Sequence, residues 1–207
     1  MLSEQISVFT IGHSVHSAER FTTLLRDAGI TAVADVRTSP YSRYSPQFNR
    51  DDVCEQLRRN GISYAYLGKE LGGRPGASRY YCDGVADYEK IAQTAEFKTG
   101  LERVIEGARK FKIALMCSEQ DPLDCHRCLL VGRALSERGV VVGHIQRDGA
   151  IATQPQIEER LLELCGRSAD DLFASREQRL LAAYRERGRK VAFAEPQRDR
   201  QGFVAAE

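Results

Sequence analysis

The sequence predicts an α/β fold: a single domain with a mainly parallel sheet of about five strands flanked by helices, in a Rossmann-like three-layer arrangement. Between residues 5 and 165, apolar runs of strand length alternate with helical repeats of apolar residues. Such alternation is typical of a parallel sheet that is covered on both faces. Residues 166–207 are rich in charge, with nine Lys/Arg and seven Asp/Glu. There we expect a C-terminal helix and arm that pack on the domain and fray at the end.

The first half of the chain contains three expected strands. They are mainly apolar runs bounded by turn or polar residues: 6–11, 31–36 and 62–67. Ser17 is a suitable N-cap for the helix after the first strand, and Gly29 ends that helix. Asp51 or Asp52 is expected to cap the next helix. After the third strand comes a glycine-rich loop, 68–76, and then irregular sequence of a kind that is often functional.

The second half contains two more strands and three helices. The expected strands are 113–117 and 140–145, and the expected helices are 88–110, 122–138 and 154–165. Gly100 is a candidate break in the first of these helices. Asp121 is expected to cap the second helix with Pro122 as its first residue, which places Cys125 in the second turn. In the tail, five residues are expected to form one apolar helical face: Leu172, Phe173, Leu180, Leu181 and Tyr184.

The composition is that of an ordinary globular chain. Hydrophobic residues make up 42% and charged residues 29% of the 207 residues, as in typical domains. The net charge of +1 argues against a strongly basic nucleic-acid-binding protein but allows a local basic cleft. We see no signal peptide and no apolar run near the roughly 20 residues of a membrane span. We therefore expect a cytoplasmic protein with no membrane partner, whose six cysteines are free thiols.

Polar side chains stand at the carboxyl ends of four expected strands. In chain order these are His13 and Ser14, Asp35 and Arg37, Cys117 and Glu119, and His144. The carboxyl ends of parallel strands meet at one edge of a sheet, where α/β proteins bind ligands. The alternative is that these residues are polar only because loops are polar. We favour one shared functional cleft at this edge of the sheet.

A second polar cluster, Cys125, His126 and Arg127, stands near the expected start of a helix. The helix dipole and the neighbouring cations favour a thiolate at Cys125, and Arg127 could bind an oxyanion through two hydrogen bonds. The alternative is that Cys125 is a small buried apolar residue. Cys125 and Cys128 also form a Cys-x-x-Cys pair. Cys128 shares a helical face with Val131, however, which favours a place in the core over a redox dithiol.

Two further hypotheses concern metal and phosphate. Residue types that bind zinc occur at several of these positions: His13, Cys117, Cys125, His126 and His144. The paired Cys-x-x-Cys spacing of common structural zinc sites is absent, so we assign no metal ligand and no cofactor. The acid-free stretch 36–50 contains Arg43 and Tyr44, which could bind phosphate and stack on bases. The alternative for this stretch is a solvated loop stiffened by prolines.

Several of these blocks, in their order and spacing, resemble one family. They are Thr10-Ile11-Gly12-His13-Ser14, Asp35-Val36-Arg37, Tyr66-Leu67-Gly68 with Leu71-Gly72-Gly73, and Cys117-x-Glu119 followed after five residues by Cys125-His126-Arg127. Together they are similar to the family called domain of unknown function 488, over residues 6–165. The resemblance implies an α/β domain without a settled reaction or substrate. It also implies that seven residues occupy motif positions: His13, Arg37, Cys117, Glu119, Cys125, His126 and Arg127.

We therefore expect an enzyme that acts on an anionic substrate, which is a small ligand, a nucleotide or a nucleic acid. The expected catalytic residues, which supply a nucleophile, a base and a general acid, are Cys117, Glu119, Cys125, His126 and His13. The expected substrate-binding residues are Ser14, Arg37, Arg43, Tyr44, Arg127 and His144. The alternatives are a noncatalytic nucleic-acid or nucleotide-binding module and a Cys/His metal-binding protein. The sequence makes no prediction about the oligomeric state.

Overall fold

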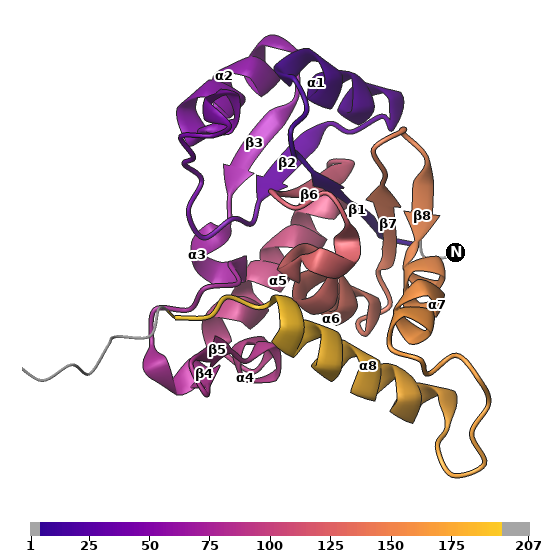
Figure 1. Cartoon of the computed structure of the whole chain (residues 1–207). Coiled ribbons are helices and arrows are strands. Elements are labelled where there is room, and N and C mark those ends of the chain that lie inside the picture. Colours follow the sequence, from indigo (N-terminus) through magenta and orange to yellow (C-terminus); the bar gives the residue numbers. More distant parts are fainter. Residues whose placement is uncertain (1–4, 196–207) are drawn as a thin grey trace, which may run out of the picture.

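A six-stranded sheet forms the centre of the protein (Figure 1). The computed structural model describes residues 5–195. The strands, in their order across the sheet, are β3 (Ser63–Tyr66), β2 (Ala32–Asp35), β6 (Ile113–Cys117), β1 (Ser7–Gly12), β7 (Val141–Ile145) and β8 (Ile151–Thr153). Neighbouring strands are parallel except β8, which pairs with β7 antiparallel. The predicted α/β fold class with a mainly parallel sheet is confirmed.

Helices pack on both faces of this sheet. They are α1 (Ala18–Asp27), α2 (Arg50–Arg59), α3 (Gly68–Leu71), α4 (Tyr88–Ala92), α5 (Ala95–Ala108), α6 (Arg133–Ser136), α7 (Gln154–Leu164) and α8 (Arg176–Val191). On one face, Phe21 of α1 and Leu57 of α2 share a core with Met116 of β6. On the other face, Leu101 of α5 shares a core with Leu115. Adjacent residues of β6 thus serve opposite cores, as the alternation of side chains along a strand requires.

The predicted N-cap is right for α1 and wrong for α2. Ser17 caps α1 as predicted, because its hydroxyl accepts a hydrogen bond from the backbone N–H of Arg20. The prediction that Asp51 or Asp52 caps α2 is wrong, since Asn49 occupies the cap position. The two aspartates lie in the first turn of α2 instead. Their charges complement the helix dipole there.

The middle of the chain contains more short elements than the sequence predicts. The expected glycine-rich loop includes α3, and the expected helix over 88–110 is two helices, α4 and α5. The break comes at Thr94, whose hydroxyl accepts from the backbone N–H of Phe97 and so caps α5. Gly100 does not break α5 and is buried within it. The prediction of a helical region is therefore right in type, but the interruption at Thr94 comes six residues before Gly100.

The edge strand β8 is a further difference from the prediction of about five strands. The chain turns back after β7 through residues 146–150, where the backbone N–H of Gln146 donates to Ala150 over 2.8 Å. Gly149 has a φ of +100° in this turn, a conformation that favours glycine. β8 has only three residues. Such a short segment carries too little periodicity to be predicted as a strand.

The segment between β6 and β7 is not the single helix that the sequence predicts. Asp121 does act as an N-cap, since it accepts from the backbone N–H of Leu123 over 2.9 Å, but only a short 3-10 turn, Pro122–Asp124, follows. Cys125 is extended, with φ −138° and ψ 139°, and the chain then enters a π-helical turn, Arg127–Gly132. The prediction that Cys125 lies in the second turn of a helix is therefore wrong. π-Helical turns are frequent at functional sites.

The tail after residue 166 forms α8, which lies along α7 (Figure 1). α8 begins at a capping box made by Ser175 and Gln178, and Tyr184 packs in the core that α7 and α8 share. Leu172 and Phe173 are 97% and 94% exposed in the preceding loop. The prediction that these two residues join the apolar face of the tail helix is therefore wrong. No described helix has the length and apolar character to cross a membrane.

After α8, an arm runs back to a small hairpin. The hairpin consists of β4 (Tyr81–Cys82) and β5 (Val85–Ala86). Ala194 forms an antiparallel bridge to Val85, and the backbone N–H of Ala86 donates to the carbonyl of Phe193 over 2.9 Å. The tail thereby returns to the middle of the chain. The expected fraying of the C-terminal end concerns residues 196–207, which lie outside the described part of the chain.

Candidate functional site

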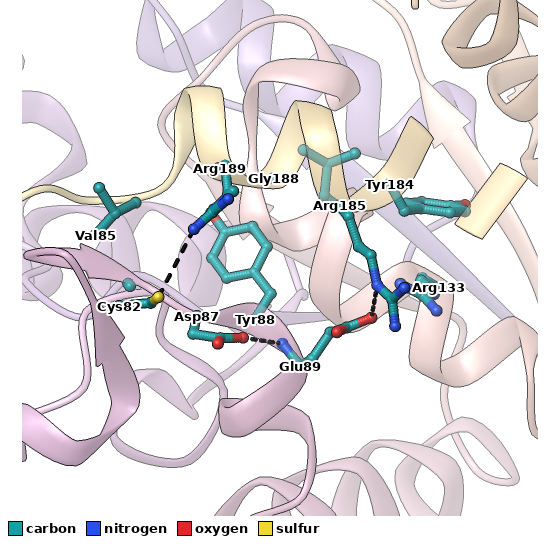
Figure 2. A pocket seen from close by; sticks show the side chains of 12 residues that line it. Cys82, Val85, Asp87, Tyr88, Glu89, Arg133, Tyr184, Arg185, Gly188 and Arg189 are labelled. Carbon is teal, nitrogen blue, oxygen red and sulfur yellow. Dashed lines mark hydrogen bonds and ion pairs between the residues drawn. The ribbon is translucent and has the colours of Figure 1, made fainter. Parts of the chain in front are cut away.

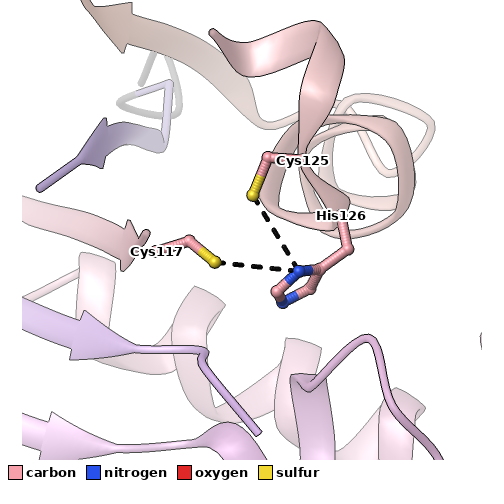
Figure 3. Close-up of side chains that lie close together, drawn as sticks. All are labelled: Cys117, Cys125 and His126. Atoms are coloured by element: carbon pink, nitrogen blue, oxygen red, sulfur yellow. Dashed lines mark hydrogen bonds between the residues drawn. The ribbon is translucent and has the colours of Figure 1, made fainter. Parts of the chain in front are cut away.

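Cys117, Glu119, Cys125 and His126 converge at the carboxyl end of β6, and we call them the thiol cluster. Figure 3 shows three of them, Cys117, Cys125 and His126. Cys117 is the last residue of β6. The extended backbone at Cys125 lets the chain turn back, and the sulfurs of Cys117 and Cys125 lie 3.8 and 3.9 Å from Nδ1 of His126. The three donor atoms are all within 4.8 Å of one another.

The imidazole of His126 has a defined orientation. Its Nε2 lies 2.9 Å from the backbone carbonyl oxygen of Val36, just beyond the end of β2. A carbonyl oxygen only accepts hydrogen bonds, so Nε2 carries the hydrogen. In the neutral ring, Nδ1 therefore presents its lone pair toward the two sulfurs. The backbone at the end of β2 thus orients the side chain of His126, which belongs to the segment after β6.

Glu119 completes the thiol cluster on the sulfur side. Its Oε2 lies 3.1 Å from Sγ of Cys117 and 2.9 Å from Sγ of Cys125. Desolvation beside the thiols, followed by the charge of Cys125, raises the pKa of Glu119 above its ordinary value. Because the residue as a whole remains exposed, this carboxyl group can still exchange protons with solvent. A carboxyl group with a raised pKa is suited to general acid–base chemistry.

The two thiols have opposite tendencies to ionise. Burial raises the pKa of Cys117 well above its ordinary value. Burial also opposes a thiolate at Cys125. The hydrogen bond from Cys117, the charge of Arg127 and, when its ring is protonated, the charge of His126 hold the pKa of Cys125 below its ordinary value. The backbone N–H of Arg127 also donates to Sγ of Cys125 over 3.4 Å. The cluster therefore favours one thiolate, at Cys125.

A pocket of about 120 Å³ opens beside the thiol cluster. The cluster forms one wall of it. The remaining lining residues come from the loop after β2, the glycine-rich loop, α4, the segment after β6, the end of α8 and the C-terminal arm: Arg37, Thr38, Ser39, Gly73, Arg74, Tyr88, Ser118, Asp124, Val191 and Phe193. Gly73 is needed at its position, because a Cβ there would lie 2.8 Å from Cγ of His126.

His13 and Arg37 reach the same sheet edge but are engaged in a network of their own. The register of β1 and β6 pairs Gly12 with Cys117, and the next residue, His13, donates its backbone N–H to Cys117 over 2.8 Å. The guanidinium of Arg37 binds both carboxylate oxygens of Asp35, at 2.9 and 2.6 Å. The predicted shared edge therefore exists, with Arg37 paired to a buried carboxylate.

The ring of His13 has no free nitrogen for base catalysis. Nδ1 donates to the carbonyl of Ser14 over 3.0 Å, and Nε2 accepts from Arg37 over 3.2 Å. Burial and the nearby Arg37 lower the pKa of His13 to about 4, so the ring is neutral at pH 7. Ser14 has a φ of +45° and does not line the pocket. The geometry thus gives no support to a catalytic His13 or a substrate-binding Ser14.

Arg127 and His144 are buried inside the protein rather than in the pocket. The guanidinium of Arg127 donates to the carbonyl oxygens of Glu119 and Gln120, at 2.6 and 3.0 Å, and so fixes the loop that carries Glu119. His144 bonds the Thr10 hydroxyl through Nδ1 and the Gln154 side chain through Nε2, both at 2.9 Å. The sequence predicts that these two residues bind substrate. In the structure their polar atoms form hydrogen bonds to other buried polar groups instead.

Arg43 and Tyr44 lie on the surface, away from the thiol cluster. The guanidinium of Arg43 packs over the ring of Tyr44, with 4.9 Å between Cζ and the ring centroid, and Tyr44 is 82% exposed. Neither residue lines the pocket. Their role in binding phosphate or nucleic acid stays a prediction about this exposed loop. Measuring nucleic-acid binding at increasing salt would test it, because phosphate-dominated binding weakens with salt.

Arg74 and Tyr88 are among the pocket residues that the sequence prediction omits. Arg74 belongs to the glycine-rich loop, and the only available signal was the unusual length of the irregular segment that follows β3. Burial and the nearby Cys125 and Cys117 raise the pKa of the Tyr88 hydroxyl far above its ordinary value. Tyr88 therefore stays protonated and can only donate a proton or hydrogen bond as a neutral phenol.

A second pocket of about 230 Å³ lies where α8 passes the small hairpin and α4 (Figure 2). Tyr88 lines both pockets. Among the charged groups of the second pocket, Arg185 binds Glu89 over 2.8 Å. Arg133 and Arg189 form ion pairs with Glu137 and Asp83, which lie outside the lining. Its lining contains no cluster of groups for acid–base or metal chemistry comparable with the thiol cluster.

Cys128 is separate from the thiol cluster. It is fully buried in the core shared with Leu161 and Tyr184, and burial raises its pKa to about 12. An inert apolar environment of this kind does not suit a redox thiol. Cys128 is thus buried in a core, as predicted, but it does not share that core with Val131, which packs in the core of the sheet with Leu115.

Comparison with known proteins yields one match. A family model described as "Domain of unknown function DUF488" matches residues 17–134, more than half of the chain. The matched range contains the whole thiol cluster together with Arg37, Arg74 and Tyr88, whereas His13 and Ser14 precede it. Neither the curated proteins nor the solved structures provide a match.

Proposed function

Since the chain belongs to the DUF488 family, which is described only as a domain of unknown function, we propose its function from the thiol cluster itself. The proposal is a zinc-dependent hydrolase in which Cys117, Cys125 and His126 hold the metal. One observation carries it: three metal-ligand atoms lie within 4.8 Å of one another on the wall of a pocket. The sequence prediction named no metal ligand, and the proposal departs from it on this observation.

The donor set supports zinc. Thiolate sulfur and imidazole nitrogen are ligands that zinc prefers. A metal-binding histidine usually donates its other ring N–H to a carbonyl or carboxylate, and His126 does so to Val36 over 2.9 Å. Three protein ligands leave the fourth tetrahedral position open, which is typical of catalytic rather than structural zinc sites.

Glu119 is the proposed general acid and base. A zinc ion bound here would act as a Lewis acid and lower the pKa of a water molecule in its open position. The Glu119 carboxylate would take a proton from that water while the water oxygen bonds to the electrophilic carbon of the substrate. The same carboxyl group returns the proton to the leaving group as its bond to that carbon breaks. One water is added across the broken bond, and no oxidant or reductant is required.

Metal analysis of the full chain tests the proposal. We expect about one zinc per chain after purification in zinc-containing medium, and its loss in Cys117→Ala and Cys125→Ala. Cys128→Ala is the matched control, because Cys128 is also buried but lies in another core, and it should retain zinc. Circular dichroism checks that each variant is folded. A folded wild-type chain that binds no zinc would overturn the proposal.

A metal-free thiol enzyme is the second candidate, in which Cys125 is the nucleophile. The lowered pKa of Cys125, despite burial, favours it through the effects of Cys117, Arg127 and His126. Iodoacetamide distinguishes the two candidates. In the thiol enzyme, Cys125 of the chain as purified alkylates faster than free cysteine at neutral pH. In the zinc enzyme, Cys125 is protected until a chelator removes the metal.

A further inference from the structure

The pocket beside the thiol cluster contains two arginines, and they differ in what they bind. Arg37 donates hydrogen bonds from Nε and one terminal nitrogen to Asp35. Its other terminal nitrogen donates to Nε2 of His13. None of the ion pairs formed within residues 5–195 includes Arg74. Arg74 is thus the pocket arginine whose guanidinium remains available to a ligand.

The position of Arg74 is fixed from two sides. Its backbone N–H donates to the hydroxyl of Thr38 over 3.2 Å, which ties the glycine-rich loop to the loop after β2. Its guanidinium carbon lies 4.7 Å from the centroid of the Phe193 ring. A guanidinium that stacks on an aromatic face keeps its N–H edge free for hydrogen bonds.

The Phe193 ring itself stands on a fixed backbone. The carbonyl of Phe193 accepts from the N–H of Ala86 over 2.9 Å, and the N–H of Glu195 donates to Gly84 over 2.8 Å. These bonds hold the C-terminal arm on the hairpin of β4 and β5. The arm therefore supplies a platform that orients Arg74 at the pocket.

The other charges of the pocket leave Arg74 as its cationic ligand-binding group. Asp124 is paired with Arg187, and Glu119 faces the two sulfurs of the thiol cluster. Three residues with aliphatic hydroxyls, Thr38, Ser39 and Ser118, share the pocket wall with Arg74. Hydroxyls and a planar guanidinium together match the oxygen atoms of a carboxylate or phosphate.

We infer that Arg74 binds the anionic group, a carboxylate or a phosphate, of the substrate that reacts at the thiol cluster. The identity of the reacting centre depends on the proposed hydrolase function. The anion site is argued separately, from the contacts of Arg74 with Thr38 and Phe193. The sequence analysis expected Arg37, Arg43 and Arg127 to bind the anion. The inference assigns this role to Arg74, a residue of the glycine-rich loop, instead. A guanidinium can bind both oxygens of such a group at once.

Anion titrations of the cobalt-substituted full chain test this inference. Acetate and inorganic phosphate are added separately at constant ionic strength, and the Co²⁺ absorption spectrum is followed. We expect saturable binding of at least one anion, weakened about 10- to 100-fold in Arg74→Gln, since the lost bonds are charge-assisted. Arg74→Lys should be intermediate, because lysine binds as a point charge. Arg79→Gln is the matched control: Arg79 packs over Tyr80 and does not line this pocket.

The outcomes separate this inference from the proposed hydrolase. Equal anion affinity in the wild type and Arg74→Gln, or no binding of either anion, would overturn the Arg74 site. A preference for acetate or for phosphate would identify the anionic group. If the chain binds no cobalt, the hydrolase proposal fails. The same titrations, followed by calorimetry on the chain as purified, then still decide whether Arg74 binds anions.

Discussion

The imidazole of His126 is held by the backbone of Val36, with 2.9 Å between Nε2 and the carbonyl oxygen. This bond joins the end of β2 to the segment that follows β6. It also fixes the tautomer that presents Nδ1 to Cys117 and Cys125, at 3.8 and 3.9 Å. The proposed metal site therefore depends on groups that lie around the ring as much as on the ligands.

Gly73 is another residue beside the His126 ring, and Gly73→Ala tests whether the space around the ring matters. A Cβ at residue 73 would lie 2.8 Å from Cγ of His126, so the ring must shift and its bond to Val36 must lengthen. We expect zinc affinity, measured by competition with a chelator, to fall about 10- to 100-fold. Gly76→Ala is the control, since a Cβ there meets nothing within 4 Å. Equal affinities in the two variants would contradict the prediction.

Glu119→Gln distinguishes a proton-transfer group from a metal ligand. The amide is nearly isosteric with the carboxyl group but cannot take up a proton from water. We expect the variant to keep its zinc and to hydrolyse chromogenic esters about 100-fold more slowly or worse. Metal analysis and ester hydrolysis are measured on the same preparation. Loss of zinc would make Glu119 the fourth ligand, which would close the open position and refute the hydrolase.

Much of the fold follows from patterns in the sequence. β6 is buried at all five residues because helices cover both faces of the sheet, and its continuous apolar run predicts this. Local competition explains the differences. Asp121 and Pro122 are signals for a helix start, and they do start a turn, but the turn ends after Asp124. Cys125 is then extended, and no periodicity in the sequence marks that change.

Part of the site is predictable because its side chains follow a strand, whereas Cys125 and His126 are predicted from their place in the cluster Cys125-His126-Arg127. Parallel strands bring their ends together, so Cys117 and Glu119 can be placed at one edge with His13. The carbonyl of Val36 is a backbone group, and residue identity does not reveal its role. His144 is misleading, since its position near a strand end resembles that of a ligand-binding residue while its ring is completely buried. Arg74 has no pattern that connects it to the sheet edge.

Arg37→Ala tests whether Arg37 is structural. Asp35 is completely buried, and without the guanidinium it keeps only the hydroxyl of Tyr64 and a backbone N–H. We expect the free energy of unfolding, measured with urea, to fall by about 3–5 kcal/mol, because one charge of a buried pair is left unpaired. The exposed pair of Arg58 and Glu55 is the control, and Arg58→Ala should change stability little. An Arg37→Ala chain of unchanged stability with weakened anion binding would restore its role as a substrate ligand.

His144 should make the folded state sensitive to acid. Its ring is neutral in the core, because Nε2 must donate to Gln154 and Nδ1 then accepts from the Thr10 hydroxyl. Burial lowers the pKa of His144 from 6.5 to about 4. The stabilisation by the neutral ring is therefore fully present above pH 6.5 and is lost as the pH falls from 6.5 toward 4.

Urea unfolding of the wild type and His144→Asn, at about pH 7.5 and about pH 4.5, checks this dependence. The variant should be less stable than the wild type near neutral pH, because it removes a buried hydrogen-bonded side chain. The stability difference should shrink by about 2–3 kcal/mol at the lower pH. In the wild type, His144 takes up a proton more readily in the unfolded chain than in the folded one, and asparagine takes up none. A difference that stays constant between the two pH values would mean that His144 takes up its proton equally well in the folded and unfolded chains.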